Sequence, residues 1–311
     1  MQRLTAGDLM QVVTKQISGL GNQLFQYAAG LYFARRYGAS LRMAVDSTQN
    51  RVSHGYPRPF LLSHFNIPIP MHPLTATERV LFSERKSIRP LANLYKRYRG
   101  IQIFAEPVSR RYTFIEDVPL QRSVRLLYLA GYWQAHGMVD AVASELRRDL
   151  QFRSPPDGRN LESIAEIKET HNSVSLHMRR GDFTLAAEGN IALPLSYYAD
   201  AIRYFQARLG EPTFFVFSDD PAFARKNLPG DAQAIFVDHN DDSTSYEDIR
   251  LMSACRHHII ANSSFSWWGA WLNSRPDKLV YAPRYWQLNA GSYYPGLFPP
   301  DWTIGDFPPR T

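Results

Sequence analysis

The sequence predicts an α/β protein built on parallel sheets, and two observations support this fold class. In the second half of the chain, short apolar runs such as residues 213–217 (TFFVF) alternate with helical patterns such as residues 197–209. Near the N-terminus, a strand pattern at residues 11–17 precedes a glycine-containing turn and a helical pattern at residues 23–37. Strands that alternate with helices pair in parallel through right-handed crossovers.

The spacing of apolar residues justifies the elements of the first half. Leu24, Ala28 and Leu31 recur at helical spacing, so one face of the first helix is apolar. Residues 125–129 (RLLYL) instead form a compact run that is typical of a buried strand. On this basis we expect strands at residues 11–17, 41–45, 101–104, 113–115 and 125–129, and helices at residues 23–37, in the basic segment up to residue 99, and at residues 139–150.

The second half is more regular, and it follows a linker. Turn-forming residues gather at residues 153–158 (RSPPDG), so we expect an N-terminal domain of residues 1–156 and a C-terminal domain of residues 157–311. The tail after Pro283 is aromatic and proline-rich and is expected to pack back on the body. In the C-terminal domain we expect strands at residues 174–176, 213–217, 234–237, 258–260 and 279–282, and helices at residues 161–169, 197–209, 245–255 and 265–272.

Composition limits the class of protein. A chain of 311 residues suits about two domains, and its 44% hydrophobic residues can form a large core. Its one cysteine, Cys255, excludes an intrachain disulfide framework and is typical of a reducing compartment. Apolar runs stay shorter than the ~20 residues of a membrane span, and residues 1–8 lack a secretory signal pattern. We therefore expect a cytoplasmic protein.

A turn rich in arginine follows the strand at residues 174–176. The motif His177-Met178-Arg179-Arg180-Gly181-Asp182 lies at the strand's carboxyl end, where open α/β sheets bind ligands. The guanidinium fork matches phosphate oxygens with two parallel hydrogen bonds. The motif therefore predicts a polyanion site, and the alternative is an Arg–Asp salt bridge that closes a surface turn.

Other strand ends carry polar groups that are expected at the same edge. Ser218 and Asp219 follow one strand, and Asn262, Ser263 and Ser264 follow another. Hydroxyls suit phosphate, and a carboxylate suits the N–H donors of guanine or the hydroxyls of ribose. Ordinary helix capping is the alternative for both segments.

Two further segments of the first half are candidates. The turn Gly19-Leu20-Gly21-Asn22 precedes a helix, where free N–H groups favour anions, although Leu24 replaces the third glycine of GxGxxG. Trp133 and Gln134 follow a strand and are candidates for contacting a sugar, with core packing as the alternative for Trp133.

Residues 78–111 form a basic segment. They contain nine lysine and arginine residues and three glutamates. This charge suits an anionic membrane surface or an anionic acceptor, and a solvated helical face is the alternative. Without a recognised nucleic-acid module we expect no nucleic-acid partner.

Motifs for metal or cofactor binding are missing from the sequence. HExxH and Walker motifs do not occur, CxxC is impossible with one cysteine, and no carboxylate cluster has convincing metal spacing. We therefore expect no cofactor and no metal. An arginine site without a metal suits a reaction in which a diphosphate leaves, because arginine neutralises the developing charge.

Four blocks together resemble the α-1,2-fucosyltransferases of glycosyltransferase family 11. They are residues 19–28 (GLGNQLFQYA), 128–134 (YLAGYWQ), 177–182 (HMRRGD) and 262–268 (NSSFSWW), in the family's order. The resemblance covers about residues 15–285, with Phe183 where tyrosine is usual and Gly269 where alanine often occurs.

The resemblance implies a GT-B fold of two Rossmann-like domains facing across a cleft, with GDP-fucose on the C-terminal domain and the acceptor on the N-terminal one. It implies an inverting, metal-independent transfer of L-fucose to O2 of a galactose in an oligosaccharide or lipid-linked glycan. By it, the catalytic residues are Arg179, Arg180 and Asp182, the donor-binding residues are His177, Asn22, Ser218, Asp219, Asn262, Ser263 and Ser264, and the acceptor residues are Trp133 and Gln134.

Two other functions remain open from the sequence. One is a glycosyltransferase that uses another nucleotide sugar. The other is a non-catalytic, lectin-like protein whose aromatic residues bind glycans. Under any of these functions, the basic segment permits a peripheral position on the inner face of the membrane.

Overall fold

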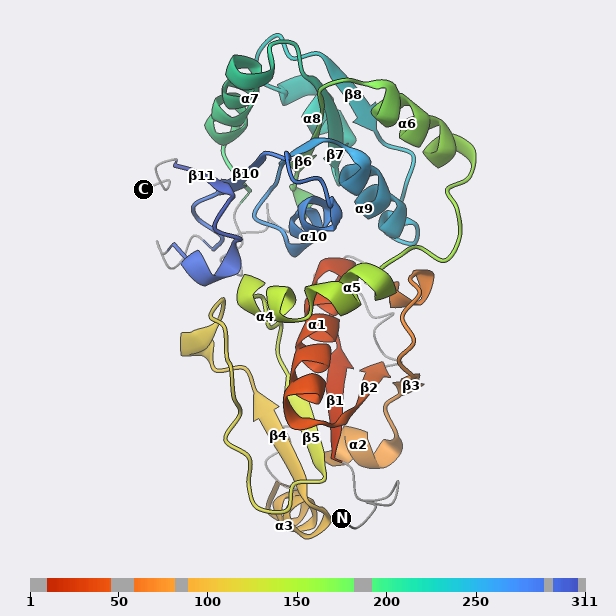
Figure 1. Cartoon of the computed structure of the whole chain (residues 1–311), viewed down its shortest axis with the longest axis vertical. Coiled ribbons are helices and arrows are strands. Elements are labelled where there is room, and N and C mark those ends of the chain that lie inside the picture. The colour runs from red at the N-terminus through yellow and green to blue at the C-terminus, as the bar shows by residue number, and fades with distance from the viewer. Residues whose placement is uncertain (1–9, 46–58, 82–88, 182–191, 288–292, 307–311) are drawn as a thin grey trace. The chain divides into compact units, whose positions relative to one another are not determined.

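The protein is described by a computed structural model that places residues 10–45, 59–81, 89–181, 192–287 and 293–306. It divides into two compact units, each with its own sheet (Figure 1). Unit 1 extends to Gln151 and unit 2 begins at Phe152, near the predicted boundary after Pro156.

Unit 1 is a parallel sheet of five strands covered by helices. Its strand order is β3-β2-β1-β5-β4, and every pairing in it is parallel. The strands are β1 (Gln11–Gln16), β2 (Ser40–Val45), β3 (Met71–Pro73), β4 (Ile101–Ala105) and β5 (Leu126–Ala130). The helices are α1 (Leu20–Tyr37), α2 (Ala76–Leu81), α3 (Arg89–Arg99), α4 (His136–Ala141) and α5 (Ala143–Asp149).

Helix α1 forms because its apolar residues match the helical period. Leu24, Phe25, Ala28 and Phe33 are fully buried, and α1 packs against β1 and β2 (red in Figure 1). The short turn between β1 and α1 therefore lies at the carboxyl end of β1. The sequence predicted a ligand-binding turn at this position, residues 19–22.

Unit 2 is a parallel sheet of six strands. Its order is β11-β10-β9-β6-β7-β8, again with only parallel pairings. The strands are β6 (Ser173–Met178), β7 (Thr213–Ser218), β8 (Ala234–Val237), β9 (His257–Ile259), β10 (Val280–Pro283) and β11 (Thr303–Gly305). The helices are α6 (Gly158–Glu169), α7 (Leu195–Leu209), α8 (Pro221–Asn227), α9 (Ser245–Ala254) and α10 (Ser264–Leu272).

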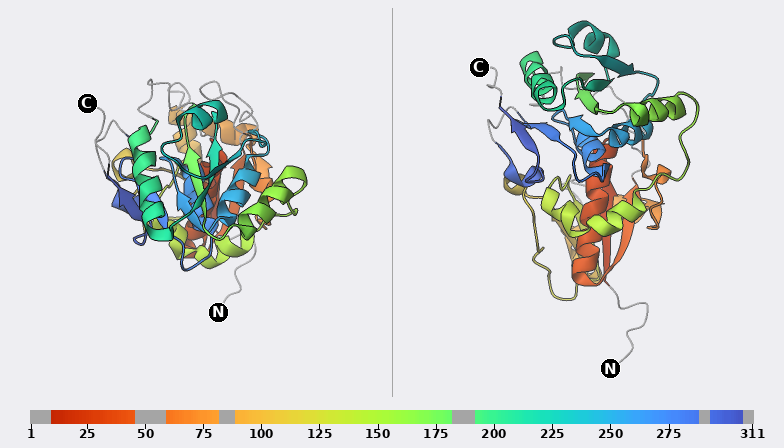
Figure 2. Two further views of the ribbon diagram at one scale, coloured as in Figure 1. Left: turned by 90° about the horizontal axis from the view of Figure 1, so that it is seen from above. Right: turned by 45° about the horizontal axis from the view of Figure 1, so that its top comes forward.

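Helices cover both faces of this sheet, which explains why its central strands are buried on both sides. All six residues of β6 are buried. Val174 and Leu176 pack with Phe205 of α7 on one face, whereas Phe215 and Phe217 of β7 pack with residues of α6 and α9 on the other. Figures 1 and 2 show α7 on one side of the β6–β7 pair and α6 and α9 on the opposite side.

The α/β class with two parallel sheets is confirmed, and some elements differ from the prediction. Residues 113–115 are not a strand, because Tyr112 has a left-handed φ of 62° and the Thr113 N–H turns back to the Arg110 carbonyl. The helix predicted at residues 139–150 is two helices, α4 and α5, separated at Val142. Strands β3 and β11 were not predicted, since each has three residues and neither is an apolar run.

The described part of the tail packs on unit 2. Strand β11 adds an edge to the sheet by pairing with β10. The indole N–H of Trp267 donates to the Leu297 carbonyl at 3.0 Å, and Trp286, Phe298 and Trp302 are buried. These aromatic side chains therefore form part of the core of unit 2.

Candidate active site

The centre of the unit 2 sheet is a topological switch point. Strand β6 pairs with β7 on one side and with β9 on the other, so the connections after β6 lead in opposite directions. In open α/β sheets, ligands bind beyond the carboxyl ends of strands at such a point. The predicted residues lie at or just after the carboxyl ends of β6, β7 and β9. We call residues 177–181, 218–220 and 260–265 the unit 2 rim.

Arg179 is held by the neighbouring strand. Its Nη1 lies 2.8 Å from Oδ2 of Asp219, and the Arg180 backbone N–H donates to Oδ1 of the same carboxylate at 2.7 Å. Both side chains of the ion pair are mostly buried, with 17% and 20% exposed. The pair therefore joins two strand ends and is not a salt bridge that closes an exposed surface turn. It fixes the Arg179 guanidinium at the switch point.

Arg180 presents a second guanidinium in a different environment. Its Cζ lies 3.7 Å from the centre of the Phe223 ring, an arrangement that stabilises the cation. Its Nε is buried and has no hydrogen-bond partner in the described part of the chain. A buried donor without a partner carries a desolvation penalty, so this N–H is suited to an acceptor that a ligand brings.

His177 is neutral in this environment. It is 5% exposed, its ring lies 5.8 Å from that of Phe265, and its Nδ1 is buried without a partner among the described residues. Burial, followed by the positive charge of Arg179, lowers the pKa of His177 to about 3. The sequence analysis grouped this histidine with the arginines as part of a polyanion site. In the structure the His177 imidazole is neutral, so it can contribute a hydrogen bond but no positive charge.

The residues after β7 divide between two roles. Asp220 caps α8 by accepting the Phe223 N–H at 3.0 Å. Ser218 Oγ donates to the Met178 carbonyl at 2.7 Å and accepts the Asp220 N–H at 3.0 Å. Helix capping therefore accounts for Asp220, whereas Asp219 orients the arginines.

The residues after β9 also have structural partners. Asn262 is buried and its Nδ2 donates to the Trp286 carbonyl at 3.3 Å. Ser263 caps α10 through the Phe265 N–H at 3.3 Å, and Ser264 is the first residue of that helix. These residues form the rim beside His177, where Ser263 caps α10 and Asn262 holds the tail at Trp286. Asp182 lies outside the described residues.

The carboxyl end of the unit 1 sheet carries a network of amides. Gln134 Nε2 donates to Asn22 Oδ1 at 2.5 Å, and Asn22 Nδ2 donates to Ser18 Oγ at 3.0 Å. Ser18 itself has a left-handed φ of 67°. The structure thus joins two predicted residues, Asn22 after β1 and Gln134 after β5, and we call this set, with residues 106 and 131–133, the unit 1 rim.

Trp133 does not belong to an exposed acceptor surface. It is 2% exposed, its ring stacks with Phe104 at 5.9 Å between centres, and it meets Phe33 edge to face. The core alternative is therefore correct for Trp133. Its neighbour Tyr132 is the exposed aromatic residue of this turn.

Glu106 is a rim residue that the sequence analysis did not find. Its carboxylate accepts the backbone N–H groups of Tyr132 and Trp133 at 2.8 and 3.2 Å, and burial raises its pKa. Trp133 has a left-handed φ of 58° and Gly131 a φ of 156°, where a Cβ would lie 2.4 Å from the Glu106 Cβ. The carboxylate thus holds a strained turn, and its only sequence signal was an acidic residue directly after β4.

The described residues contain neither a candidate metal cluster nor a helix that could cross a membrane. No group of three or more His, Cys, Asp or Glu side chains there is arranged to hold a metal ion. No helix in the same part of the chain is long and apolar enough to cross a membrane.

Two parallel α/β units, each with its own sheet, are the architecture of the GT-B fold class. The fold is similar to NodZ α-1,6-fucosyltransferase soaked with GDP-fucose, with a TM-score of 0.50, 18% identity and coverage of 85% of this chain and 92% of that one. It is also similar to POFUT1 in complex with GDP, with a TM-score of 0.51, 12% identity and coverage of 90% and 99%.

The chain belongs to glycosyltransferase family 11. Residues 60–290 match the sequence profile of glycosyl transferase family 11. An O-antigen biosynthesis glycosyltransferase of Escherichia coli is 33% identical over 86% of this chain and 92% of its own length. An α-1,2-colitosyltransferase of the same species is 31% identical over 88% and 92%, and galactoside α-(1,2)-fucosyltransferase 1 of Mus musculus is 26% identical over 81% and 60%.

Proposed function

We propose that this protein is an inverting galactoside α-1,2-fucosyltransferase, which transfers L-fucose from GDP-β-L-fucose to O2 of a galactose. The acceptor is a galactose-terminated oligosaccharide or a lipid-linked glycan. Family membership and the α-1,2 specificity in relatives' names support the linkage. Structures with the same fold that were soaked with GDP-fucose or are in complex with GDP support the donor.

The observation that carries the proposal is the pair of arginines at the switch point of unit 2. Arg179 is oriented by Asp219, and Arg180 has a buried Nε that awaits an acceptor. Two guanidinium groups at the carboxyl end of a parallel sheet suit the oxygens of a diphosphate. The neutral imidazole of His177 adds a hydrogen bond without adding charge.

The reaction follows from this arrangement. The galactose O2 attacks the anomeric carbon of fucose from the face opposite GDP, the bond from that carbon to the β-phosphate oxygen breaks, and its electron pair leaves with GDP. The O2 proton passes to a base that we do not assign. Arg179 and Arg180 stabilise the negative charge that develops on the diphosphate, which is most valuable in the transition state. In this proposal arginine supplies the positive charge that other transferases obtain from a metal cation, so no metal is required.

A second donor deserves a direct test because of one relative. The α-1,2-colitosyltransferase is 31% identical over most of this chain, and it transfers a different sugar according to its name. Nucleotide-activated colitose is therefore the competing donor. A comparison of kcat/KM for the two donors, with one galactoside acceptor, distinguishes them.

The first experiment is calorimetric titration of the purified protein with GDP and with UDP, in the presence of EDTA. We expect selective binding of GDP, followed by GDP release and a fucosylated galactoside when GDP-fucose is supplied. The α-1,2 linkage of that product is read by NMR. Glycan binding that is unaffected by GDP, with no turnover, would instead support a lectin-like function. Selective UDP binding would point to another nucleotide sugar, and binding lost in EDTA would contradict metal independence.

A further inference from the structure

Helix α3 exposes the side chains that a helix normally buries. Leu91, Leu94, Tyr95 and Tyr98 have the spacing i, i+3, i+4 and i+7, so they share one face. In a globular unit such a stripe packs on the core, but here Leu91 is 75% exposed, Leu94 68% and Tyr98 84%. The helix itself is held by contacts with α2 and β4. Its apolar face is therefore directed away from the unit that carries it.

Positive charge surrounds this stripe. With about 3.6 residues per turn, Arg97 and Arg99 fall on either side of it. Lys96 is a third cation in the last turn of the same helix. Helix α3 itself contains no acidic residue between Arg89 and Arg99. The surface thus combines exposed leucine and tyrosine with the positive charge of the helix that carries them.

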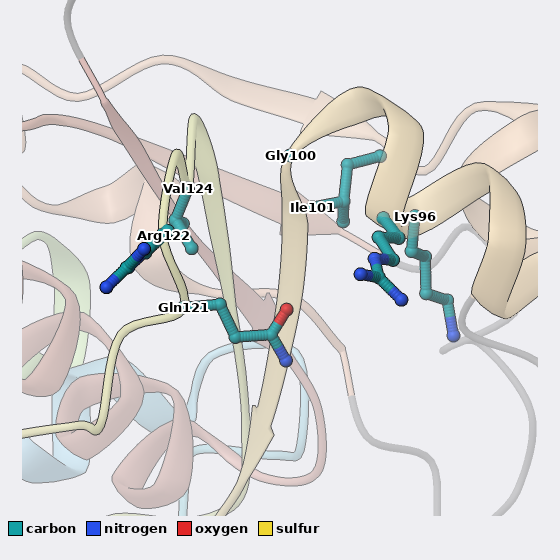
Figure 3. Close-up of a pocket in the computed structure, with 7 residues that line it drawn as sticks. Lys96, Gly100, Ile101, Gln121, Arg122 and Val124 are labelled. Carbon is teal, nitrogen blue, oxygen red and sulfur yellow. The ribbon is translucent and has the colours of Figure 1, made fainter.

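A basic pocket lies at the end of the same helix. It has a volume of about 440 Å³ and its cationic lining residues are Lys96, Arg97 and Arg122. Figure 3 shows Lys96 on α3 at one side, Arg122 on the facing loop at the other, and Gln121 between them. The pocket is large enough for a phosphate group and its neighbours, and its charge suits one.

The frame of this pocket is fixed. Gly100 ends α3 with a φ of 64°, where a Cβ would lie 2.5 Å from the Ser123 carbonyl oxygen. The Gly100 carbonyl accepts the N–H groups of Arg125 and Leu126, and Gln102 Oε1 accepts the Gln121 N–H at 2.8 Å. The helix and the loop that carry the basic residues are thus joined to the starts of β4 and β5. The surface lies at the amino ends of these strands, whereas the unit 1 rim lies at their carboxyl ends.

We propose that α3 and the pocket beneath it dock unit 1 on an anionic phospholipid bilayer. The leucines and tyrosines enter the boundary between headgroups and acyl chains, and the basic residues contact lipid phosphates. An apolar stripe with flanking arginine is typical of a helix that lies in the membrane interface, where tyrosine is also enriched. A second copy of this surface is a poor partner because it carries the same charge. Docking through this edge leaves the unit 1 rim open, and the proposal does not rest on the proposed activity.

The test is flotation of the full chain with vesicles of phosphatidylcholine alone and of phosphatidylcholine mixed with phosphatidylglycerol. We expect binding only to the anionic vesicles, with a clear decrease on raising the salt concentration, because charge contacts at a surface are screened. Arg97→Gln or Arg122→Gln should each lower the partition coefficient about fivefold, as expected for one cation near an anionic surface. Leu94→Ser combined with Tyr98→Ser should abolish binding at physiological salt.

Matched controls come from unit 2. Arg225→Gln removes an equally exposed charge, and Leu161→Ser removes a leucine that is 55% exposed on α6. Both should bind anionic vesicles as the unmodified chain does. The substituted residues of α3 are exposed, so circular dichroism should show unchanged folding in every variant. Equal binding to neutral vesicles, no binding to either vesicle, or equal losses in the unit 2 controls would overturn the proposal. If an acidic polypeptide released the protein from anionic vesicles and salt did not, the surface would instead suit an acidic protein partner.

Discussion

The two units share an architecture and differ in the chemistry at the carboxyl ends of their strands. The unit 2 rim has two arginines, an orienting carboxylate and a buried neutral histidine. The unit 1 rim has a chain of amides and hydroxyls, Gln134 to Asn22 to Ser18, beside a turn held by Glu106. One rim thus carries charged side chains, and the other carries mainly neutral groups that donate and accept hydrogen bonds.

This difference shows that the same sheet architecture can carry two different sets of polar groups. The polar groups of the unit 1 rim largely satisfy one another, so the rim is preorganised by its own hydrogen bonds. The unit 2 rim keeps two buried polar nitrogens without partners in the described residues, Arg180 Nε and His177 Nδ1. Unsatisfied buried groups are costly unless a ligand completes them. Unit 2 should therefore gain more from binding an anionic donor than unit 1 gains from binding a sugar.

The largest expected effect is the loss of Arg179. Arg179→Ala should lower kcat with GDP-fucose by at least about 100-fold, by analogy with the loss of one donor to a developing anion. The matched control is Arg225→Ala, which also breaks an Arg–Asp pair beside a strand end but leaves the rim untouched. The measurement is steady-state kinetics. Activity of Arg179→Ala within a few-fold of the control would remove this arginine from the mechanism.

The next effect concerns the strained turn of unit 1. Glu106→Gln keeps the size of the side chain but replaces one acceptor by an amide that faces a backbone N–H. The turn should shift, and because small misplacements cost catalysis, kcat/KM for the acceptor should fall between about 10-fold and 100-fold. GDP affinity, measured by calorimetry, should be unchanged. The exposed Glu116→Gln is the control, and a parallel loss of GDP affinity would show that the two rims do not act separately.

The third prediction concerns the pH dependence of unfolding that the buried His177 of the unit 2 rim should cause. The pKa of His177 is about 3 in the folded protein, and its ordinary value is 6.5. Between these values only the unfolded chain binds this proton, so the free energy of unfolding falls as pH drops below 6.5. His177→Gln should remove about 1.4 kcal/mol per pH unit of that slope. Urea titrations between pH 6.5 and 4.5 measure it, and an identical slope in the variant would contradict a neutral, buried imidazole.

The smallest effect is the coupling between the two amides of unit 1. Asn22→Ala and Gln134→Ala, alone and together, form a double-mutant cycle around the 2.5 Å hydrogen bond. We expect a coupling of about 1 kcal/mol in the free energy of unfolding, the usual net value of such a bond. Additive single effects would mean that the unit 1 rim is not preorganised by this contact.

The sequence alone determined the alternation of strands and helices and the location of the polar strand ends. Both depend on local patterns: β7 is an apolar run with five buried residues, and the turn after it begins with the polar Ser218-Asp219-Asp220. It also determined that Arg179 and Arg180 follow a buried central strand, because β6 is apolar and short. The spacing of apolar residues did not predict the short strands β3 and β11 or the break between α4 and α5 at Val142.

Only the tertiary structure decided which of these side chains meet. Asp219 and Asp220 are adjacent and chemically identical, yet one orients the arginine of a neighbouring strand and the other caps a helix. Trp133 became core and Glu106 became part of the rim through partners 26 or more residues away in sequence. The physical reason is that burial and hydrogen-bond pairing across strands depend on the arrangement of the sheet, which local sequence patterns do not contain.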